Sequence, residues 1–247
     1  MIPSRPPDRV AVLIPALNEE ASLPGVLGQI AGWGVDRVVV VDNRSTDGTA
    51  RVAREGGAEV VHEPERGYGA ACLAGIHHLK ADPPDILVFL DGDQSDDPAA
   101  IADLLEPIRG GRADFVVGVR TAPAPEGRSA VPVHARLGNR LVRLGALLIH
   151  GARFRDLGPF RAIRFPSLLA LGMDDRNWGW TLQMQLRAHH FGLRTAEVEV
   201  PHRPRAAGRS KISGTVRGTL GAGGKMLLTL VRERFHRPSR VASRGSP

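Results

Sequence analysis

The sequence predicts an α/β protein with a doubly wound, mostly parallel sheet. The first observation is that segments of helical spacing alternate with short apolar runs of strand length, namely Val10–Ile14, Val38–Val41, Ile86–Leu90 and Phe115–Val119. The second is that polar or acidic residues follow most of these runs. Ligands bind at the carboxyl ends of strands in open α/β sheets, so these polar residues are expected to face a site.

The first half of the chain repeats a unit of strand, loop and helix. After the run ending at Ile14, Ser22 is placed to cap a helix that reaches Ile30. Further helices are expected from Ala50, from Gly67-Tyr-Gly69 to Leu79, and over residues 99–108, with Val60–Val61 in a strand between the first two. Such repetition is typical of parallel strands joined by crossover helices.

Beyond Arg120 the pattern changes. Residues 121–127 indicate a loop, and apolar residues at positions 137, 141, 144 and 148 predict a helical face. A turn and short strand, the start of a helix, and the strand that closes the sheet are expected at Asp156–Arg164, Trp178–Gln185 and Val198–Val200. Trp178 and Trp180 fit either core anchors or one wall of a binding site.

The charge distribution divides the chain into a domain over residues 1–205 and a basic C-terminal segment over residues 206–247. The net charge is +7, but residues 203–247 contain 11 Lys or Arg and a single acid, Glu233. This stretch therefore carries +10 and residues 1–202 carry −3. A basic segment on a nearly neutral body indicates an anionic partner, whether a phosphate-bearing ligand, an anionic lipid or a nucleic acid.

Several protein classes are disfavoured. The chain has no apolar run of 18 residues and no signal-peptide pattern at its start, so we expect a cytoplasmic protein. The single cysteine, Cys72, excludes an internal disulfide. A dinucleotide-binding domain needs Gly-x-Gly-x-x-Gly after the first strand, where this chain has Pro15–Glu20. With 4% aromatic residues and no nucleic-acid-binding motif, we expect no nucleic acid partner.

Asp91 and Asp93 are the strongest candidates for chemistry. Two carboxylates one residue apart at a strand end can hold a hard divalent cation, which neutralises a substrate diphosphate. The same stretch fits a turn that begins a helix, with Asp96 or Asp97 as N-cap and Pro98 at the first helical position. The two interpretations are compatible.

The chain also contains, in this order, the segments Ile14–Glu20, Val41–Thr49, Leu90–Asp93, Asp156–Arg161 and Gly208–Lys211. With these segments it resembles the family 2 glycosyltransferases of the GT-A fold, and especially their dolichyl- and polyprenyl-phosphate sugar synthases. The resemblance implies inverting transfer of a sugar from a UDP- or GDP-sugar to a polyprenyl phosphate.

Roles for individual residues follow from the resemblance. The donor pocket is expected to include Pro15, Asn18, Glu20, Asp42, Asp91 and Gly92. The alternative role of Asp42 is turn chemistry, in which its side chain accepts from the nearby backbone. Asp93, with Asp91, is expected to coordinate Mg²⁺ or Mn²⁺, which makes the nucleoside diphosphate a better leaving group. The reacting centre is expected to include Asp156, Arg161 and Gln183. Phosphate groups are expected to meet Arg120, Arg136, Arg161, Arg209, Ser210 and Lys211.

Two positions depart from the family pattern. Ser95 stands where many relatives have a glutamine, with Gln94 one place early, which leaves a third protein metal ligand unassigned. Gln183 stands where relatives often have an acid, and an amide cannot act as a general base. A phosphate acceptor is already ionised and needs no base, so this departure favours a phosphate over a hydroxyl acceptor.

Alternatives remain open at this point. They are transfer to a soluble hydroxyl acceptor and nucleotide-sugar binding without turnover. From Val216 on, apolar residues at positions 220, 227, 228, 231 and 235 alternate with Lys and Arg in an amphipathic pattern. This segment either binds an anionic membrane surface, which makes the protein peripherally membrane-associated, or packs onto the domain. The sequence leaves open whether the chain forms a homo-oligomer.

Overall fold

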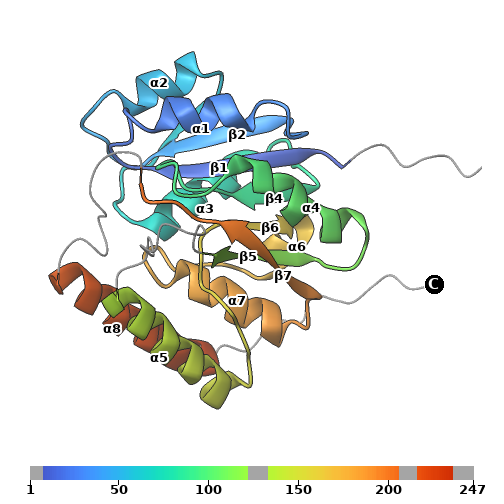
Figure 1. Cartoon of the computed structure of the whole chain (residues 1–247), viewed down its shortest axis with the longest axis vertical. Helices are drawn as coiled ribbons and strands as arrows, with labels where there is room; N and C mark the ends of the chain where they lie inside the picture. The colour runs from blue at the N-terminus through green and yellow to red at the C-terminus, as the bar shows by residue number, and fades with distance from the viewer. Residues whose placement is uncertain (1–7, 122–132, 206–215, 236–247) are drawn as a thin grey trace, which may run out of the picture.

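The computed structural model describes residues 8–121, 133–205 and 216–235 and confirms the predicted α/β class (Figure 1). The strands are β1 (Val10–Ala16), β2 (Arg37–Asp42), β3 (Glu59–His62), β4 (Ile86–Phe89), β5 (Phe115–Thr121), β6 (Arg161–Arg164) and β7 (Thr195–Pro201). The helices are α1 (Leu23–Ile30), α2 (Thr49–Glu55), α3 (Tyr68–Leu79), α4 (Ile101–Arg109), α5 (Val133–His150), α6 (Phe165–Ala170), α7 (Trp180–His190) and α8 (Val216–Phe235). A short 3-10 helix, Pro98–Ala100, precedes α4, with Asp97 as its N-cap.

The seven strands form one sheet in the order β3-β2-β1-β4-β6-β5-β7. Neighbours among β1, β2, β3 and β4 run parallel, and β7 runs parallel to β5 at the edge. Among the described strands, β6 alone is antiparallel to its neighbours, β4 and β5. The sheet is therefore mostly parallel, as predicted, and the carboxyl ends of β1, β2 and β4 lie at one edge.

Side chains of the central strands alternate between two apolar cores, one on each face of the sheet. In β1, Val12 and Ile14 belong to the first core, and Ala11 and Leu13 belong to the second. Helices α1, α2 and α4 cover the first face, and α3, α6 and α7 cover the second (Figure 1). Because these strands are buried on both faces, their sequences are continuous apolar runs rather than alternating ones.

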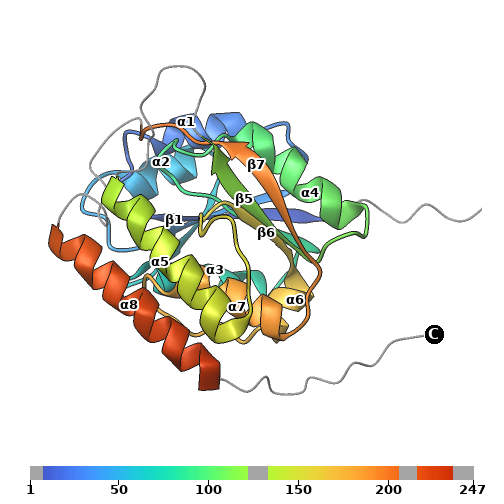
Figure 2. The same cartoon turned by 60° about the horizontal axis from the view of Figure 1, so that its bottom comes forward.

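Helices α5 and α8 lie side by side and form a further layer outside α7 (Figure 2). Val142, Leu186 and Leu230 share the core between these three helices. The apolar face predicted for α5 points away from this core, because Leu141, Leu144 and Leu148 are exposed. On the part of α8 whose side chains are described, residues 223–235, the large exposed apolar residues are Leu227, Leu228, Val231 and Phe235. No helix in the part of the chain that the structure describes is long and apolar enough to cross a membrane.

A buried ion pair joins α8 to α7. Arg187 Nε donates to Glu233 Oε2 at 2.8 Å, and neither side chain is exposed at all. Arg187 also donates to Asp174 Oδ1 at 2.9 Å and to the carbonyl oxygens of Leu171 and Gly172. Although the sequence predicted a boundary after residue 205, α8 thus shares a core and a buried ion pair with α7.

Candidate functional site

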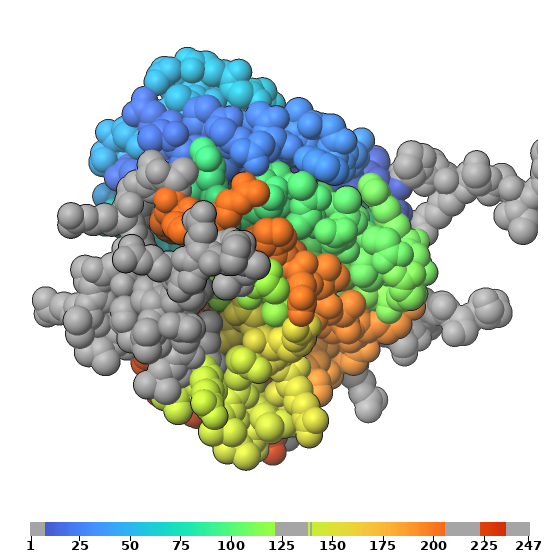
Figure 3. Space-filling model, viewed as in Figure 1, coloured from blue at the N-terminus to red at the C-terminus, as the bar shows by residue number. Residues whose placement is uncertain are grey.

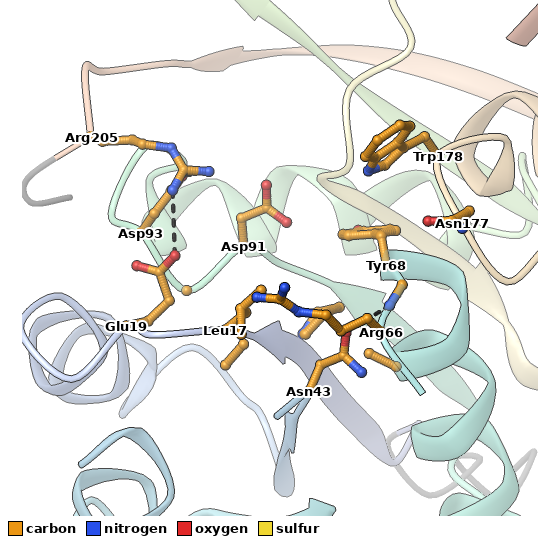
Figure 4. A pocket seen from close by; sticks show the side chains of 15 residues that line it. Leu17, Glu19, Asn43, Arg66, Tyr68, Asp91, Asp93, Asn177, Trp178 and Arg205 are labelled. Atoms are coloured by element: carbon orange, nitrogen blue, oxygen red, sulfur yellow. Dashed lines mark hydrogen bonds and ion pairs between the residues drawn. The ribbon is translucent and has the colours of Figure 1, made fainter. Parts of the chain in front are cut away.

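A cavity of about 390 Å³ lies beyond the carboxyl ends of β1, β2 and β4 (Figure 4). It is lined by Pro15, Ala16, Leu17, Glu19, Asn43, Arg66, Gly67, Tyr68, Ala71, Asp91, Gly92, Asp93, Asn177, Trp178 and Arg205. Four of the residues predicted from the sequence, Pro15, Asp91, Gly92 and Asp93, are therefore together in one cavity. Its position is the one expected for a ligand site in an open α/β sheet.

Left-handed turns shape the edge of this cavity. Asn18, Arg44 and Gln94, which follow β1, β2 and β4, have φ values of 55°, 64° and 62°. This conformation is uncommon for residues other than glycine and persists where nearby contacts hold it. Asn18 Oδ1 accepts from Thr46 N at 2.8 Å, and Gln94 Nε2 donates to Ser22 O at 2.7 Å. The turns are thereby tied to one another and to the start of α1.

Three carboxylates and one guanidinium gather at one end of the cavity (Figure 4). Asp93 is buried, and its Oδ2 lies 2.8 Å from Arg205 Nη2. Arg205 Nη1 lies 3.3 Å from Glu19 Oε1. Asp91 is half-buried, and burial, together with repulsion from neighbouring carboxylates, raises its pKa well above the usual range. Additional positive charge in this cavity would favour the ionised form of Asp91.

Aromatic side chains of Tyr68 and Trp178 stand at the other end (Figure 4). Tyr68 begins α3, whose start lies directly against the loop before α7. Ala70 N donates to Arg176 O at 2.9 Å, and a Cβ at Gly69 would collide with the backbone oxygen of Asp175. The Gly67-Tyr-Gly69 sequence therefore permits close backbone packing that places both aromatic residues at the cavity.

The structure also distinguishes the two tryptophans that the sequence left open. Trp178 is half-buried and lines the cavity. Trp180 is only 1% exposed and meets Phe89 edge to face, with ring centroids 6.3 Å apart. One tryptophan is a wall of the site and the other is a core anchor.

Three predicted donor residues, Asn18, Glu20 and Asp42, are not among the residues that line the cavity. Glu20 Oε2 accepts from Gly48 N at 2.9 Å, at the start of α2. Asp42 Oδ1 accepts from Ser45 N at 2.9 Å, and its Oδ2 lies 2.9 Å from His62 Nδ1. Asp42 thus makes the turn contact that the sequence offered as its alternative role. The donor-binding roles of these residues stay predictions.

Sequence reasoning missed Glu19, Asn43 and Arg205. Asn43 Nδ2 donates to Glu65 O at 2.6 Å and its Oδ1 accepts from Gly67 N at 2.8 Å, so this side chain shapes the loop that leads into α3. Glu19 and Asn43 are each next to a residue that the motifs did identify. Their place beside a predicted residue was the one sign in the sequence that they would line the site. For Arg205 the sequence showed only that it lies in a basic stretch.

Asp156 and Arg120, predicted separately for the reacting centre and for phosphate binding, form one ion pair. Arg120 Nε and Nη2 each donate to a different Asp156 oxygen at 2.7 Å. Burial opposes ionisation of Asp156, but the hydrogen bonds and charge of Arg120 outweigh it and lower the pKa. Burial opposes the charge of Arg120, but the hydrogen bonds and charge of Asp156, with smaller contributions from Asp96 and Asp91, raise its pKa. Asp156 is therefore an ionised support for Arg120.

Arg161 lies in the interior. Its side chain is 1% exposed, Nη1 donates to Thr181 O at 3.0 Å, and Cζ lies 5.8 Å from the ring centroid of Phe115. Burial lowers the pKa of Arg161 to about 10, which still leaves it cationic near neutral pH. It does not line the cavity, and its catalytic role stays a prediction.

Gln183 lies in the buried network beneath α8 and not in the cavity. Its Oε1 accepts from Asp175 N at 2.9 Å, and its Nε2 donates to Asp174 Oδ1 at 2.7 Å and to Glu233 Oε1 at 2.8 Å. Both ends of the amide are thus used to join α7, α8 and the loop before α7. The remaining predicted residues, the side chain of Arg136 and the whole of Arg209, Ser210 and Lys211, lie outside the described residues.

The acidic end of the cavity fits a hard divalent cation. Among the described residues, no three His, Cys, Asp or Glu side chains converge as a complete metal site. Mg²⁺, however, is commonly held by one or two carboxylates together with substrate phosphates. Oxygens of Asp93 and Glu19 already converge on a single positive group, the Arg205 guanidinium, with Asp91 in the same cavity. Carboxylate oxygens are the donors that Mg²⁺ and Mn²⁺ prefer.

Comparison with known sequences gives consistent matches. The model of "Glycosyl transferase family 2" matches residues 11–172. An uncharacterized glycosyltransferase of Mycobacterium tuberculosis is 41% identical over 214 residues, which cover 86% of this chain and 94% of that protein. The undecaprenyl-phosphate mannosyltransferase of Micrococcus luteus is 31% identical over 227 residues, which cover 85% of this chain and 90% of that protein.

Comparison with solved structures identifies the fold. The crystal structure of glucosyl-3-phosphoglycerate synthase from Mycobacterium tuberculosis, in complex with Mn²⁺, uridine diphosphate and phosphoglyceric acid, matches with a TM-score of 0.72. The match covers 94% of this chain and 80% of that one at 21% sequence identity. At this identity the likeness concerns the arrangement of strands and helices.

Proposed function

The chain belongs to glycosyl transferase family 2 and has its GT-A fold, and we propose that it transfers a sugar from a nucleotide-diphospho-sugar to a polyprenyl phosphate at a membrane surface. The acceptor, the use of Mg²⁺ or Mn²⁺ and the membrane contact are parts of this proposal. Inversion at the anomeric carbon is expected from the family resemblance.

The observation that carries the donor half of the proposal is the division of the cavity into an acidic and an aromatic end. A UDP- or GDP-sugar has a flat base at one end, the sugar at the other, and the diphosphate between them. Tyr68 and Trp178 offer ring faces and edges on which a base or sugar can pack. Asp91 and Asp93 lie where a cation would join the protein to the diphosphate.

The reaction needs a stabilised leaving group, because the nucleoside diphosphate departs as the acceptor attacks the anomeric carbon. Asp93 and Asp91 would hold the Mg²⁺ or Mn²⁺, which would supply a Lewis acid for the negative charge of the diphosphate. Arg120, whose Nε and Nη2 are both held by Asp156, adds a fixed positive charge that favours binding of the negative diphosphate. The amide of Gln183 is used inside the buried network, so the proposal for the acceptor does not rest on this residue.

The observation that favours a lipid acceptor is the surface formed by the exposed apolar residues of α5 and α8, here called the α5–α8 surface. It consists of Leu141, Leu144, Leu147, Leu148, Ile149, Leu227, Leu228, Val231 and Phe235. Within these helices the one acid is Glu233, which is buried, whereas Arg140 and Arg234 are exposed. Apolar side chains together with unopposed cations fit an anionic membrane surface.

An acceptor assay tests the function. The protein would be incubated with UDP- and GDP-sugars, Mn²⁺ and either undecaprenyl phosphate or a soluble hydroxyl acceptor, and products would be identified by mass spectrometry. We expect a sugar-linked lipid phosphate, no turnover in EDTA, and none for Asp93→Asn. Asp97→Asn is the matched control, because Asp97 pairs with Arg203 outside the cavity. Full activity in EDTA would refute the metal role, and product from the soluble acceptor alone would refute the lipid acceptor.

A vesicle assay tests the membrane contact separately. The protein should float with vesicles that contain phosphatidylglycerol and not with pure phosphatidylcholine, and high salt should release it because salt screens surface charge. Leu148→Glu combined with Leu228→Glu should abolish flotation. Leu169→Glu is the control, since Leu169 is 41% exposed on α6, away from the α5–α8 surface. Equal binding to neutral vesicles, or an unaffected double variant, would contradict the proposal.

A further inference from the structure

The residues that follow β7 are tied to the loop that follows β4. Arg203 N donates to Ser95 O at 2.8 Å, and the guanidinium of Arg203 meets Asp97 at 2.7 Å. His202 Nδ1 lies 3.2 Å from Asp96 Oδ1. In the space-filling view these residues, in orange, lie against green residues that follow β4 and blue residues near the N-terminus (Figure 3). Residues 202–205, here called the strap, are thus fixed to the loop after β4, beside the acidic end of the cavity that Arg205 lines.

Arg205 is the last described residue of this strap, and it is the one that enters the cavity. Its guanidinium lies 2.8 Å from Asp93 Oδ2 and 3.3 Å from Glu19 Oε1. The other Asp93 oxygen, Oδ1, already accepts from Ser95 N at 2.9 Å. Arg205 therefore holds the Asp93 oxygen that is not bonded to the backbone.

A divalent cation and Arg205 compete for that oxygen. Mg²⁺ binds carboxylate oxygen at about 2.0–2.1 Å and requires nearly ideal octahedral geometry. A guanidinium nitrogen in direct contact with Oδ2 occupies a position that the cation or its other ligands need, and two positive groups there repel each other. The side chain of Arg205 is 30% exposed, whereas that of Asp93 is 2% exposed, so the arginine is the partner that can move.

We propose that Arg205 is an exchangeable counter-ion of the cation site: the incoming divalent cation displaces it from Asp93, and the released guanidinium then contacts the diphosphate of the donor. This proposal rests on the proposed function, because it assumes that Asp93 binds the cation. Arg205 lines the same cavity as Asp91 and Asp93, so a change of its side-chain conformation is enough to reach a ligand there. Arg205 then couples cation binding to donor binding.

The competition predicts opposite effects of one substitution. A cation that must first displace a bound group binds with an apparent Kd equal to its intrinsic Kd divided by the fraction of sites that are free. Arg205→Gln should therefore lower the Kd for Mn²⁺ about tenfold in the absence of donor. The same variant should bind UDP and GDP about tenfold more weakly at saturating Mn²⁺, since a charge-assisted contact to phosphate is lost. A residue that merely stabilised the loop would weaken both.

The experiment measures Mn²⁺ binding by electron paramagnetic resonance on the full chain without donor, and then UDP and GDP binding by calorimetry with Mn²⁺ present. Arg203→Gln is the matched control, because it removes the same charge from the same strap, at the ion pair with Asp97. It should leave both affinities within about twofold of the wild type. Arg205→Lys keeps the charge and should remain close to wild type in Mn²⁺ affinity.

The outcomes separate the two proposals. If Asp93→Asn binds Mn²⁺ as the wild type does, the cation role of Asp93 fails, and this inference fails with it. If Asp93→Asn loses Mn²⁺ while Arg205→Gln matches the wild type or Arg203→Gln, the proposed function stands and the exchange is overturned. Weaker Mn²⁺ binding by Arg205→Gln also overturns it, because Arg205 then supports the site instead of competing for it.

Discussion

Two arginines of this chain, Arg187 and Arg205, are each bound to two acids, and their surroundings differ. Arg187 and Glu233 are fully buried, and the Nε and both terminal nitrogens of Arg187 meet carboxylate or carbonyl oxygens. Arg205 is 30% exposed and makes its contacts with Asp93 and Glu19 at the edge of a cavity. The first arginine joins two helices, and the second joins two loops at the end of the sheet.

This difference separates charges that hold the fold from charges that serve a ligand. Removing one partner of a buried ion pair leaves an uncompensated charge without water, so such a pair resists exchange. A partly exposed guanidinium can leave its carboxylates because water can solvate it, and an incoming cation then compensates the buried charge of Asp93. The burial of a charged cluster and the number of its hydrogen-bonding groups that have partners therefore indicate whether it holds the fold or serves a ligand.

Breaking the Arg187–Glu233 pair should have the largest effect on stability. Glu233→Ala leaves Arg187 buried beside Asp174 alone, and we expect the free energy of unfolding to fall by about 3–5 kcal/mol. Urea denaturation followed by circular dichroism measures it. Arg232→Ala is the control: its partner is also Asp174, but both side chains are about half-exposed, so the loss should stay below about 1 kcal/mol. Equal losses would show that α8 is held mainly by its apolar core.

The Arg120–Asp156 pair tests an intermediate case. Asp156→Asn should lower the free energy of unfolding by about 3 kcal/mol at pH 7, because the pair is mostly buried. The pKa of Asp156 is lowered in the folded protein, so its contribution is fully present above the unfolded value of about 3.9 and is lost as pH falls through the folded value.

The difference between wild type and Asp156→Asn should therefore be constant from about pH 7 to pH 5 and shrink below about pH 4. Thermal unfolding at a series of pH values measures this difference. A difference that grew in acid would mean that Asp156 is not held ionised by Arg120. In the acceptor assay the same variant should lower kcat more than donor affinity, since it disturbs the orientation of Arg120.

Gln183→Glu should have a smaller effect, which also shrinks in acid but does so at a higher pH than the effect of Asp156→Asn. The substitution replaces the Nε2 donor to Asp174 and Glu233 by a carboxylate, which we expect to cost about 2 kcal/mol at pH 7. The new carboxyl group, buried beside two acids, would have a raised pKa, so the cost should grow as pH rises through that pKa and shrink in acid. Thermal unfolding at the pH values used for Asp156→Asn measures this cost. If Gln183→Glu were more stable than the wild type, the buried hydrogen-bond network assigned to Gln183 would be wrong.

The strands and the acidic pair were predictable because they depend on local sequence. Five apolar residues, Ile86–Leu90, can form only a short buried element, and the residues that follow must then emerge at the end of the sheet. Asp91 and Asp93 were placed correctly at the cavity for this reason. The helix of α5 was also predicted from its period, but a period does not tell whether the apolar face points inward, and Leu148 is 75% exposed.

The residues that were missed depend on tertiary structure. The left-handed conformation of Asn18 reverses the chain so that Glu19 lines the cavity and Glu20 caps the turn before α2. Arg205 meets Asp93 because β7 lies beside β5 and its continuation pairs with the loop after β4. Neither arrangement follows from the spacing of residue types along the sequence.

Substitution of Trp178 should change the stability least. Trp178 lines the cavity, so we expect its substitution to affect ligand binding instead. Trp178 is half-buried in the aromatic wall, so Trp178→Ala should change the free energy of unfolding by less than about 1 kcal/mol. If the ring packs against the donor, its loss should weaken UDP or GDP binding about fivefold to tenfold, which corresponds to about 1–1.4 kcal/mol.

Trp33→Ala is the matched control for Trp178→Ala, because Trp33 is 40% exposed and lies outside the cavity. It should leave nucleotide binding unchanged while altering stability as little. Calorimetric titration with Mn²⁺ present measures both variants under the same conditions. If the two variants bind nucleotide equally well, the aromatic end of the cavity does not contact the donor nucleotide, and Trp178 is then available to face the acceptor.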